Sequence, residues 1–147
     1  TRRPRGFGCC GRRQRAVDVR AIRPDEIDAA SRLLVANDWG SRVADPELFR
    51  ELLARSQLAL VAVDDNGCVL GFLRALTDGL FNGYISMVVV DEAHRHRGVG
   101  TALVRAAMGD NPAMTWVLRA GRESVAPLYE KLGFIKSAVA MDRAGKR

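Results

Sequence analysis

The sequence predicts a mixed α/β domain in which one β-sheet carries helices on both faces. Short segments that read as strands, of which residues 16–22 alternate apolar and polar residues, are interspersed with segments of helical period. The expected order is β-α-α-β-β-β-α-β-α-β, with hairpins first and helix crossovers later, which is typical of a sheet with antiparallel and parallel pairs. No apolar run approaches the roughly 18 residues that would suggest a membrane span.

The first half of the chain is predicted to contain a strand, two helices and a β-hairpin. The segments are a strand at 16–22, a helix after Pro24, a helix from Asp45-Pro46 to about Arg55, a strand at 58–63 and a strand from Cys68. Asp45 followed by Pro46 is an N-cap before a proline at the first helical position. Residues 64–67, Asp-Asp-Asn-Gly, form a hairpin turn.

The second half is predicted to alternate strands with helices. The segments are a strand at 84–91, a helix to about Met108, a strand at 114–120, a helix from Ser124 to Gly133 and a final strand at 134–142. The apolar second half of the strand at 84–91 indicates burial on both faces. Gly133 is suited to the position just after a helix end.

Charge divides the chain into a tail and a domain. Residues 1–15 contain six arginines and no Asp or Glu, which accounts for the net charge of +6. We expect this tail to be disordered. Residues 16–147, with 17 Lys and Arg against 17 Asp and Glu, are expected to form a single domain. Three cysteines without a regular spacing predict no disulfide framework and a cytoplasmic location.

A basic, glycine-rich turn stands between the strand at 84–91 and the helix that follows. It reads Arg95-His96-Arg97-Gly98-Val99-Gly100-Thr101. A helix N-terminus attracts anions through its unpaired N–H groups, and glycine lets a ligand approach them. The turn lacks the Gly-Lys-Ser/Thr of a Walker A loop and the third glycine of a dinucleotide motif. Spacing and charge alone leave two interpretations open, a phosphate site and a helix cap with solvated arginines.

With the preceding strand, this turn resembles the acetyl-CoA-binding motif of the GNAT superfamily of amine N-acetyltransferases. The signature is Gln or Arg, two residues, Gly, one residue, and Gly or Ala; Arg95, Gly98 and Gly100 occupy its fixed positions. His96 stands where many members carry glycine. The resemblance implies that the backbone N–H groups of residues 96–101 bind the CoA pyrophosphate. The implied cofactor-binding residues in the turn are Arg95, His96, Arg97, Gly98, Val99, Gly100 and Thr101.

A second segment, residues 124–134, is similar to the other CoA-contacting motif of that superfamily, a helix that carries a tyrosine and ends in Leu-Gly-Phe. The resemblance covers about residues 17–141 and is strongest over 84–134. It implies a GNAT-like fold, with a central, mostly antiparallel sheet, a parallel pair of strands at the CoA site and helices on both faces.

The resemblance also implies chemical roles for particular residues. In the superfamily a bulge in the central strand frees backbone N–H groups for the acyl oxygen. The matching residues, Val88, Val89 and Val90, would face the pantetheine arm of acetyl-CoA. Tyr129 matches the tyrosine that in many members gives a proton to the departing CoA sulfur. A phenol with a pKa of about 10 is protonated at neutral pH and can act as this acid.

The sequence does not assign a general base. Deprotonating an alkyl ammonium of pKa about 10.4 at pH 7 costs roughly 4.6 kcal/mol. Many GNAT enzymes use a glutamate on the central strand, but the matching positions here are Tyr84 and Ser86. Either another group serves, or the acceptor amine is already largely neutral. The acceptor pocket is expected around residues 37–39 and 80–82.

The leading hypothesis is an acyltransferase, a GNAT-type N-acetyltransferase that moves an acetyl group from acetyl-CoA to a primary amine. Direct attack in a ternary complex is expected, because no cysteine lies in the matched site. The acceptor is a small molecule or a protein. The alternative is a non-catalytic acyl-CoA-binding sensor or partner module, which the missing strand carboxylate favours. A third hypothesis, nucleic-acid association, rests on the tail alone. No metal and no membrane partner are expected, and the chain is expected to be a monomer or homodimer.

Overall fold

The computed structural model describes residues 17–121 and 125–146, and within them a five-stranded sheet of order β1-β2-β3-β4-β5. The strands are β1 (Asp18–Ala21), β2 (Leu58–Val63), β3 (Val69–Thr77), β4 (Asn82–Val90) and β5 (Thr115–Leu118). Pairs β1–β2, β2–β3 and β3–β4 are antiparallel, whereas β4–β5 is parallel. The predicted mixed sheet is therefore confirmed.

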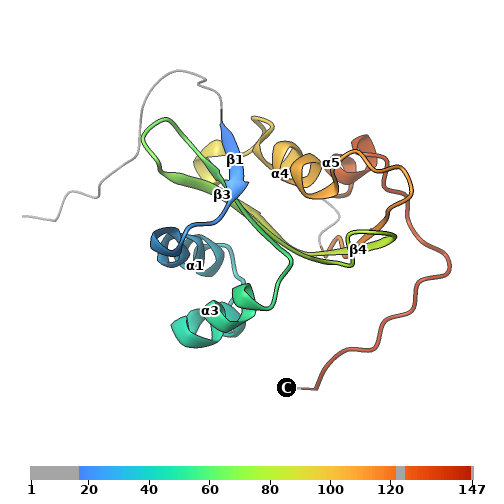
Figure 1. Cartoon of the computed structure of the whole chain (residues 1–147), viewed down its shortest axis with the longest axis horizontal. Helices are drawn as coiled ribbons and strands as arrows, with labels where there is room; N and C mark the ends of the chain where they lie inside the picture. The colour runs from blue at the N-terminus through green and yellow to red at the C-terminus, as the bar shows by residue number, and fades with distance from the viewer. Residues whose placement is uncertain (1–16, 122–124, 147) are drawn as a thin grey trace, which may run out of the picture.

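Helices cover both faces of this sheet. They are α1 (Ile27–Ala36), α2 (Ser41–Ala44), α3 (Pro46–Ala54), α4 (Val99–Met108) and α5 (Ala126–Lys131), with single 3-10 turns η1 (Pro24–Glu26) and η2 (Glu92–His94). Figure 1 shows α1 and α3 on one side of the sheet and α4 and α5 on the other. We call the side of α1 to α3 the first face and the side of α4 and α5 the second face.

Each face has its own buried apolar cluster. On the first face, Phe49 of α3 meets Phe72 of β3 edge to face, with ring centroids 6.0 Å apart. On the second face, Leu103 and Val104 of α4 pack on alternate residues of β2, β3 and β4. The alternation of β-strand side chains thus sends one half of each strand into each cluster.

A glycine allows the close approach of α4 to the sheet. A Cβ built on Gly71 of β3 would lie 2.9 Å from Cδ1 of Leu103 and 3.1 Å from Cγ1 of Val99. These contacts are tight, so a larger residue at position 71 would require the side chains of α4 to shift away from β3. The N-terminal turn of α4 is thereby held against the central strands.

Local signals specified two boundaries directly. Asp45 caps α3, since its Oδ1 accepts hydrogen bonds from the backbone N–H groups of Glu47 at 3.0 Å and Leu48 at 3.3 Å. The turn between β2 and β3 has Gly67 at φ 76°, and Asp64 Oδ1 accepts from the N–H groups of Asn66 and Cys68, each at 2.9 Å. Both features confirm the sequence predictions.

Some expectations require correction, and others concern residues that the structure does not describe. The strand predicted at 134–142 is wrong: this segment has no strand pairing, and Ile135, Val139 and Met141 are 88–99% exposed. The short helix α2 was not predicted. Cys68 is disulfide-bonded, contrary to the expectation from the cysteine content. The tail at 1–15 and the helix start at Ser124 lie outside the described residues.

Candidate functional site

The centre of the candidate site is the point where β4 and β5 separate. Their parallel pairing runs from Asn82 opposite Thr115 to Ile85 opposite Leu118, where β5 ends. Strand β4 continues to Val90 and remains paired with β3. The edge of β4 over residues 86–90 therefore faces away from β3 without a strand beside it. We call this edge, with the end of β5, the fork.

Backbone alternation decides which N–H groups point into the fork. The N–H of Asp91 donates to the carbonyl of Leu70 in β3 at 2.8 Å. Because N–H groups along an antiparallel pair alternate in direction, Val89 also faces β3, whereas Val88 and Val90 face the fork. The sequence grouped all three valines at the cofactor; the strand register gives the outward-facing N–H groups to two of them.

A bulge interrupts β4 at the start of the fork. Arg74 is opposite Met87 while the next residue of β3, Ala75, is opposite Ile85, so Ser86 is an extra residue without a partner. A bulge reorients the strand and releases its backbone from the ladder. The resemblance implied such a bulge, and the register places it at Ser86, immediately beyond the last pair of β4 with β5.

The glycine turn, residues 95–101, follows η2 and includes the first residues of α4. His96 has φ 62° and Gly98 has φ 83°, both in the left-handed region. That conformation costs a residue with a side chain roughly 1–2 kcal/mol, so His96 is held there by its surroundings.

The turn presents an unpaired set of donors. Within the described part of the chain, no backbone N–H of residues 96–101 donates a hydrogen bond; the first that does is Ala102, to Gly98 O at 3.0 Å. Six successive N–H groups at the positive end of a ten-residue helix form an anion-binding arrangement.

The two glycines of the motif have different roles. No atom lies within 4 Å of a Cβ built on Gly98, so its requirement is the positive φ at the start of α4. A Cβ on Gly100 would make ordinary contacts, 3.5 Å to Leu128 and 3.6 Å to Val90. Gly100 therefore marks the point where α4, α5 and the end of β4 meet.

The two arginines of the motif also differ. Arg95 donates from Nε to the carbonyl of Val90 at 3.4 Å and from Nη2 to Oδ1 of Asn37, which caps α1. Its side chain thus joins the turn to the end of β4 and to α1. Arg97 is exposed at the turn. The first arginine supports the loop, and the second contributes charge at its surface.

Tyr129 lies on α5, in the cluster of the second face. Its ring meets Phe134 edge to face at 5.9 Å, and burial raises the pKa of its hydroxyl above the ordinary value of 10.0. The C-terminus of α5 fixes this arrangement, because the N–H of Phe134 donates to Tyr129 O at 3.0 Å and Gly133 has φ 92°. Contact of the neighbouring Leu128 with the Gly100 region puts α5 beside the fork.

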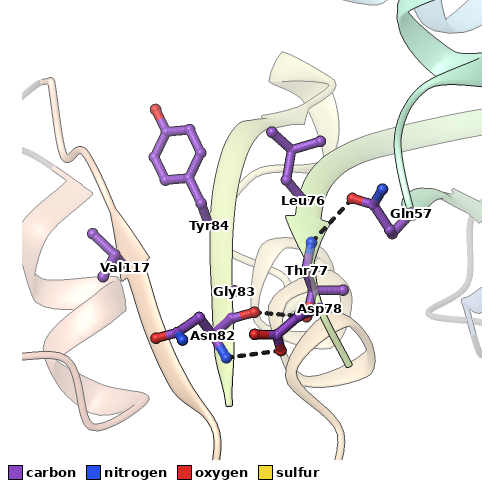
Figure 2. A pocket seen from close by; sticks show the side chains of 8 residues that line it. All are labelled: Gln57, Leu76, Thr77, Asp78, Asn82, Gly83, Tyr84 and Val117. Carbon is purple, nitrogen blue, oxygen red and sulfur yellow. Dashed lines mark hydrogen bonds between the residues drawn. The ribbon is translucent and has the colours of Figure 1, made fainter. Parts of the chain in front are cut away.

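A shallow pocket of about 570 Å³ lies on the first face (Figure 2). It is beside the paired residues of β4 and β5 that precede the fork. It is lined by Gln57, Leu76, Thr77, Asp78, Asn82, Gly83, Tyr84 and Val117. Tyr84 and Leu76 are cross-strand partners, and in Figure 2 their side chains point to the same side of the sheet. The pocket thus occupies the part of the first face that the loop after α3 borders.

Asp78 holds the loop at the edge of this pocket. Its Oδ1 accepts hydrogen bonds from the backbone N–H groups of Leu80, Phe81 and Asn82 at 2.8 to 3.0 Å. These bonds lower the pKa of the carboxyl group to about 2. The carboxylate is thus a structural acceptor through Oδ1, and its low pKa makes it a poor general base.

The two segments expected to build the acceptor pocket are not brought together. Asn37 is bonded to Arg95 beyond the end of β4, whereas Asn82 begins that strand and lines the pocket. Nine residues of strand separate the two ends, which corresponds to roughly 30 Å. Trp39 packs into the first-face cluster, and Phe81 is 62% exposed.

Sequence reasoning missed Arg74, a charged residue near this pocket. It is 9% exposed, donates from Nε to Ser56 Oγ at 2.8 Å and from Nη1 to Ser86 Oγ at 2.9 Å. The available signal was an arginine inside the otherwise apolar run Val-Leu-Gly-Phe-Leu-Arg-Ala-Leu. An ionised side chain within a buried strand requires a specific reason.

No group of three or more His, Cys, Asp and Glu side chains in the described residues could hold a metal ion, and His94 Nδ1 is 2.7 Å from Asp91 Oδ2. None of the helices in the described ranges is long and apolar enough to cross a membrane.

Comparison with known proteins adds to this geometry. The acetyltransferase (GNAT) domain family matches residues 55–136. Over 84 residues, 54% of this chain, the sequence is 32% identical to N-alpha-acetyltransferase 30 of Xenopus laevis, of which the match covers 31%. The chain thus spans about a third of the length of that curated relative.

Solved structures show the same fold. One is Ard1 from Thermoplasma volcanium, 24% identical with a TM-score of 0.68, over 84% of this chain and 85% of that one. Another is a GNAT family acetyltransferase from Streptococcus pneumoniae, 19% identical with a TM-score of 0.66, over 88% of this chain and 98% of that one.

Proposed function

The chain belongs to the GNAT acetyltransferase family, and we propose that it transfers an acetyl group from acetyl-CoA to a primary amine by direct attack in a ternary complex. The observation that carries the proposal is the set of unpaired N–H groups at residues 96–101, next to the open edge of β4. An anion-binding turn beside a free strand edge suits a ligand with a pyrophosphate and an amide-bearing arm.

The residues of the fork fit the chemistry of acyl transfer. The N–H groups of Val88 and Val90 point away from β3, where they can donate to the amide groups of the pantetheine arm and to the acyl oxygen. Attack of the amine nitrogen on the thioester carbon forms the new C–N bond, and the C–S bond then breaks. The thiolate takes a proton, for which Tyr129 is the proposed donor, and the amine loses one to solvent.

The acceptor we propose is the α-amino group of a peptide. Tyr84 and Ser86 occupy the strand positions where a carboxylate base would stand. An α-amino group has a pKa of about 7.7–8.0, so its neutral form at pH 7 costs only roughly 1 kcal/mol, against roughly 4.6 kcal/mol for a lysine side chain. The similarity to N-alpha-acetyltransferase 30 supports the same acceptor class.

The test is acetyl-CoA binding followed by turnover. Acetyl-CoA should raise the midpoint of thermal unfolding, and thiol release should appear with a peptide that has a free N-terminus. The matched control is the same peptide with a blocked N-terminus and a lysine side chain. The absence of any thermal shift would exclude both acyl transfer and acyl-CoA sensing.

The missing strand carboxylate also favours a second candidate, a non-catalytic acyl-CoA-binding module. This candidate predicts a thermal shift with acetyl-CoA but no thiol release above the buffer rate for any amine, including α-amines, alkyl amines and aromatic amines. Thiol release that depends on both protein and amine would exclude it.

A further inference from the structure

Arg74 is a buried cation that no carboxylate neutralises in the described part of the chain. Arg74 as a whole is 9% exposed. No Asp or Glu oxygen in the described residues lies within 4.0 Å of its guanidinium. By contrast Arg20, the arginine of β1, pairs through both terminal nitrogens with Glu26, at 2.7 and 2.9 Å. Buried charges in proteins are normally paired or bind a ligand.

The hydrogen bonds of Arg74 leave part of its donor set unused. A guanidinium has five N–H donors. Two of them reach the hydroxyl oxygens of Ser56 and Ser86, which leaves three without an acceptor in the described residues. Neutral hydroxyls orient the guanidinium but supply no negative charge. Burial lowers the pKa of Arg74, an effect that the nearby Tyr84 hydroxyl opposes, yet an arginine stays protonated in proteins.

The position of Arg74 connects the pocket to the fork. Leu76 of β3 lies two residues beyond Arg74 and Tyr84 of β4 two residues before Ser86, and both line the pocket. Ser86 is the bulge residue where β4 leaves β5. The guanidinium is therefore bonded to the residue that separates the pocket from the free edge of β4, where acyl transfer is proposed.

We propose that Arg74, together with Ser86 and Tyr84, forms a subsite for a carboxylate that the acceptor carries close to its reacting amine. This inference rests on the proposed function and specifies its substrate class. A carboxylate offers the planar pair of oxygens that matches a guanidinium fork and supplies the missing charge. Two sources share this chemistry, an Asp or Glu side chain near a peptide N-terminus and the α-carboxylate of a single amino acid.

Kinetics with matched acceptors test the subsite. The pairs are C-terminally amidated Asp-Ala-Ala and Asn-Ala-Ala, Glu-Ala-Ala and Gln-Ala-Ala, and glycine with glycinamide. The acid member of at least one pair should have a kcat/KM roughly tenfold or more above its amide, the size of a hydrogen bond to a charged group. A preference within the peptide pairs identifies the side-chain source, and one confined to glycine identifies the α-carboxylate. Equal or lower kcat/KM for every acid would overturn the inference.

Substitution of Arg74 distinguishes binding of the acceptor's carboxylate from a purely structural role of the arginine. In Arg74→Gln the ratio of acid to amide should fall to about one, while the thermal shift caused by acetyl-CoA is retained. The control is Arg105→Gln, which removes the same charge from an exposed site on α4 and should leave the ratio unchanged. A purely structural arginine would lower both members of a pair equally, and an unchanged ratio would contradict the subsite. If Arg74→Gln does not fold, Ser86→Ala should lower the ratio severalfold.

An equilibrium measurement keeps this test independent of turnover. Calorimetric titration in the presence of CoA compares the amidated products N-acetyl-Asp-Ala-Ala and N-acetyl-Asn-Ala-Ala. Tighter binding of the acid by roughly tenfold, lost in Arg74→Gln, supports the subsite even if no amine is acetylated. Equal binding of the two products overturns it, whatever the catalytic activity.

Discussion

Nη2 of Arg95 donates a hydrogen bond to Oδ1 of Asn37, and this contact joins the glycine turn to the C-terminal cap of α1. The same guanidinium donates from Nε to the carbonyl of Val90 at 3.4 Å. The first arginine of the motif therefore joins the turn to the neighbouring end of β4 and to α1, which is far away in the sequence. Its contribution to cofactor binding should pass through the shape of the turn.

A double-mutant cycle tests that role. Asn37→Ala and Arg95→Ala should each weaken acetyl-CoA binding by a few-fold, and the double variant should be no weaker than Arg95→Ala, because both changes remove one interaction. Arg97→Ala should also weaken binding, but additively with Asn37→Ala, since exposed Arg97 acts through charge. Calorimetric titration gives the dissociation constants of the wild type, the three single variants and the two double variants. Full additivity of Asn37→Ala with Arg95→Ala would show that the contact has no influence on the turn.

The backbone of His96, and not its ring, is expected to bind the cofactor. His96→Gly should keep the acetyl-CoA dissociation constant within about twofold, because glycine adopts φ 62° without strain and retains the N–H. His96→Pro should weaken binding by roughly tenfold or more, since proline lacks the N–H and fixes φ near −65°. Thermal unfolding verifies that both variants fold. An equal loss in both would assign the binding to the imidazole.

Tyr129→Phe should lower turnover by roughly a hundredfold, the range of general acid catalysis, while acetyl-CoA affinity changes by less than about twofold. Burial raises the pKa of Tyr129 above its ordinary value, so any loss of activity from ionisation of the hydroxyl should occur at a higher pH than for an exposed phenol. Phe134→Leu is the matched control, because it weakens the ring contact without removing a proton donor. Unchanged turnover in Tyr129→Phe would exclude Tyr129 as the acid.

The loop beside the pocket should make the stability of the protein sensitive to acid. The folded pKa of Asp78, about 2, lies below its ordinary value of 3.8. The carboxylate therefore contributes stability that is complete above pH 4 and is lost as the pH falls through about 2. Urea unfolding between pH 2 and 5 measures this loss, and Asp78→Asn should be less stable than the wild type above pH 4, with the difference shrinking toward pH 2. A constant difference across that range would contradict the assignment.

Local sequence signals predicted the elements whose ends are determined by nearby residues. The cap at Asp45 and the turn at Gly67 each depend on hydrogen bonds within four residues, so the sequence alone located them. The strand expected at 134–142 was wrong because an apolar segment does not itself supply a neighbouring strand. A strand needs a partner edge, and pairing over long separations is a tertiary property.

The candidate site was predicted only in part, because some of its residues are neighbours in the sequence and others are brought together by the fold. The glycine turn is a continuous motif, and the structure gives it the unpaired N–H groups that the motif requires. Arg74, Ser56 and Ser86 come from β3, the loop after α3 and the bulge of β4, and only strand pairing brings them together. Likewise the expected acceptor segments were separated because the nine residues of β4 lie between them.

Amide hydrogen exchange at residues 96–101, with and without saturating acetyl-CoA, tests most directly whether the glycine turn binds the cofactor through its backbone. The N–H groups have no acceptor in the described residues, so they should exchange quickly in the free protein. Bound acetyl-CoA should slow their exchange by at least roughly tenfold, while the exposed turn around Gly67 is unaffected. Acetyl-CoA that binds yet leaves the exchange of residues 96–101 unchanged would contradict the proposed site.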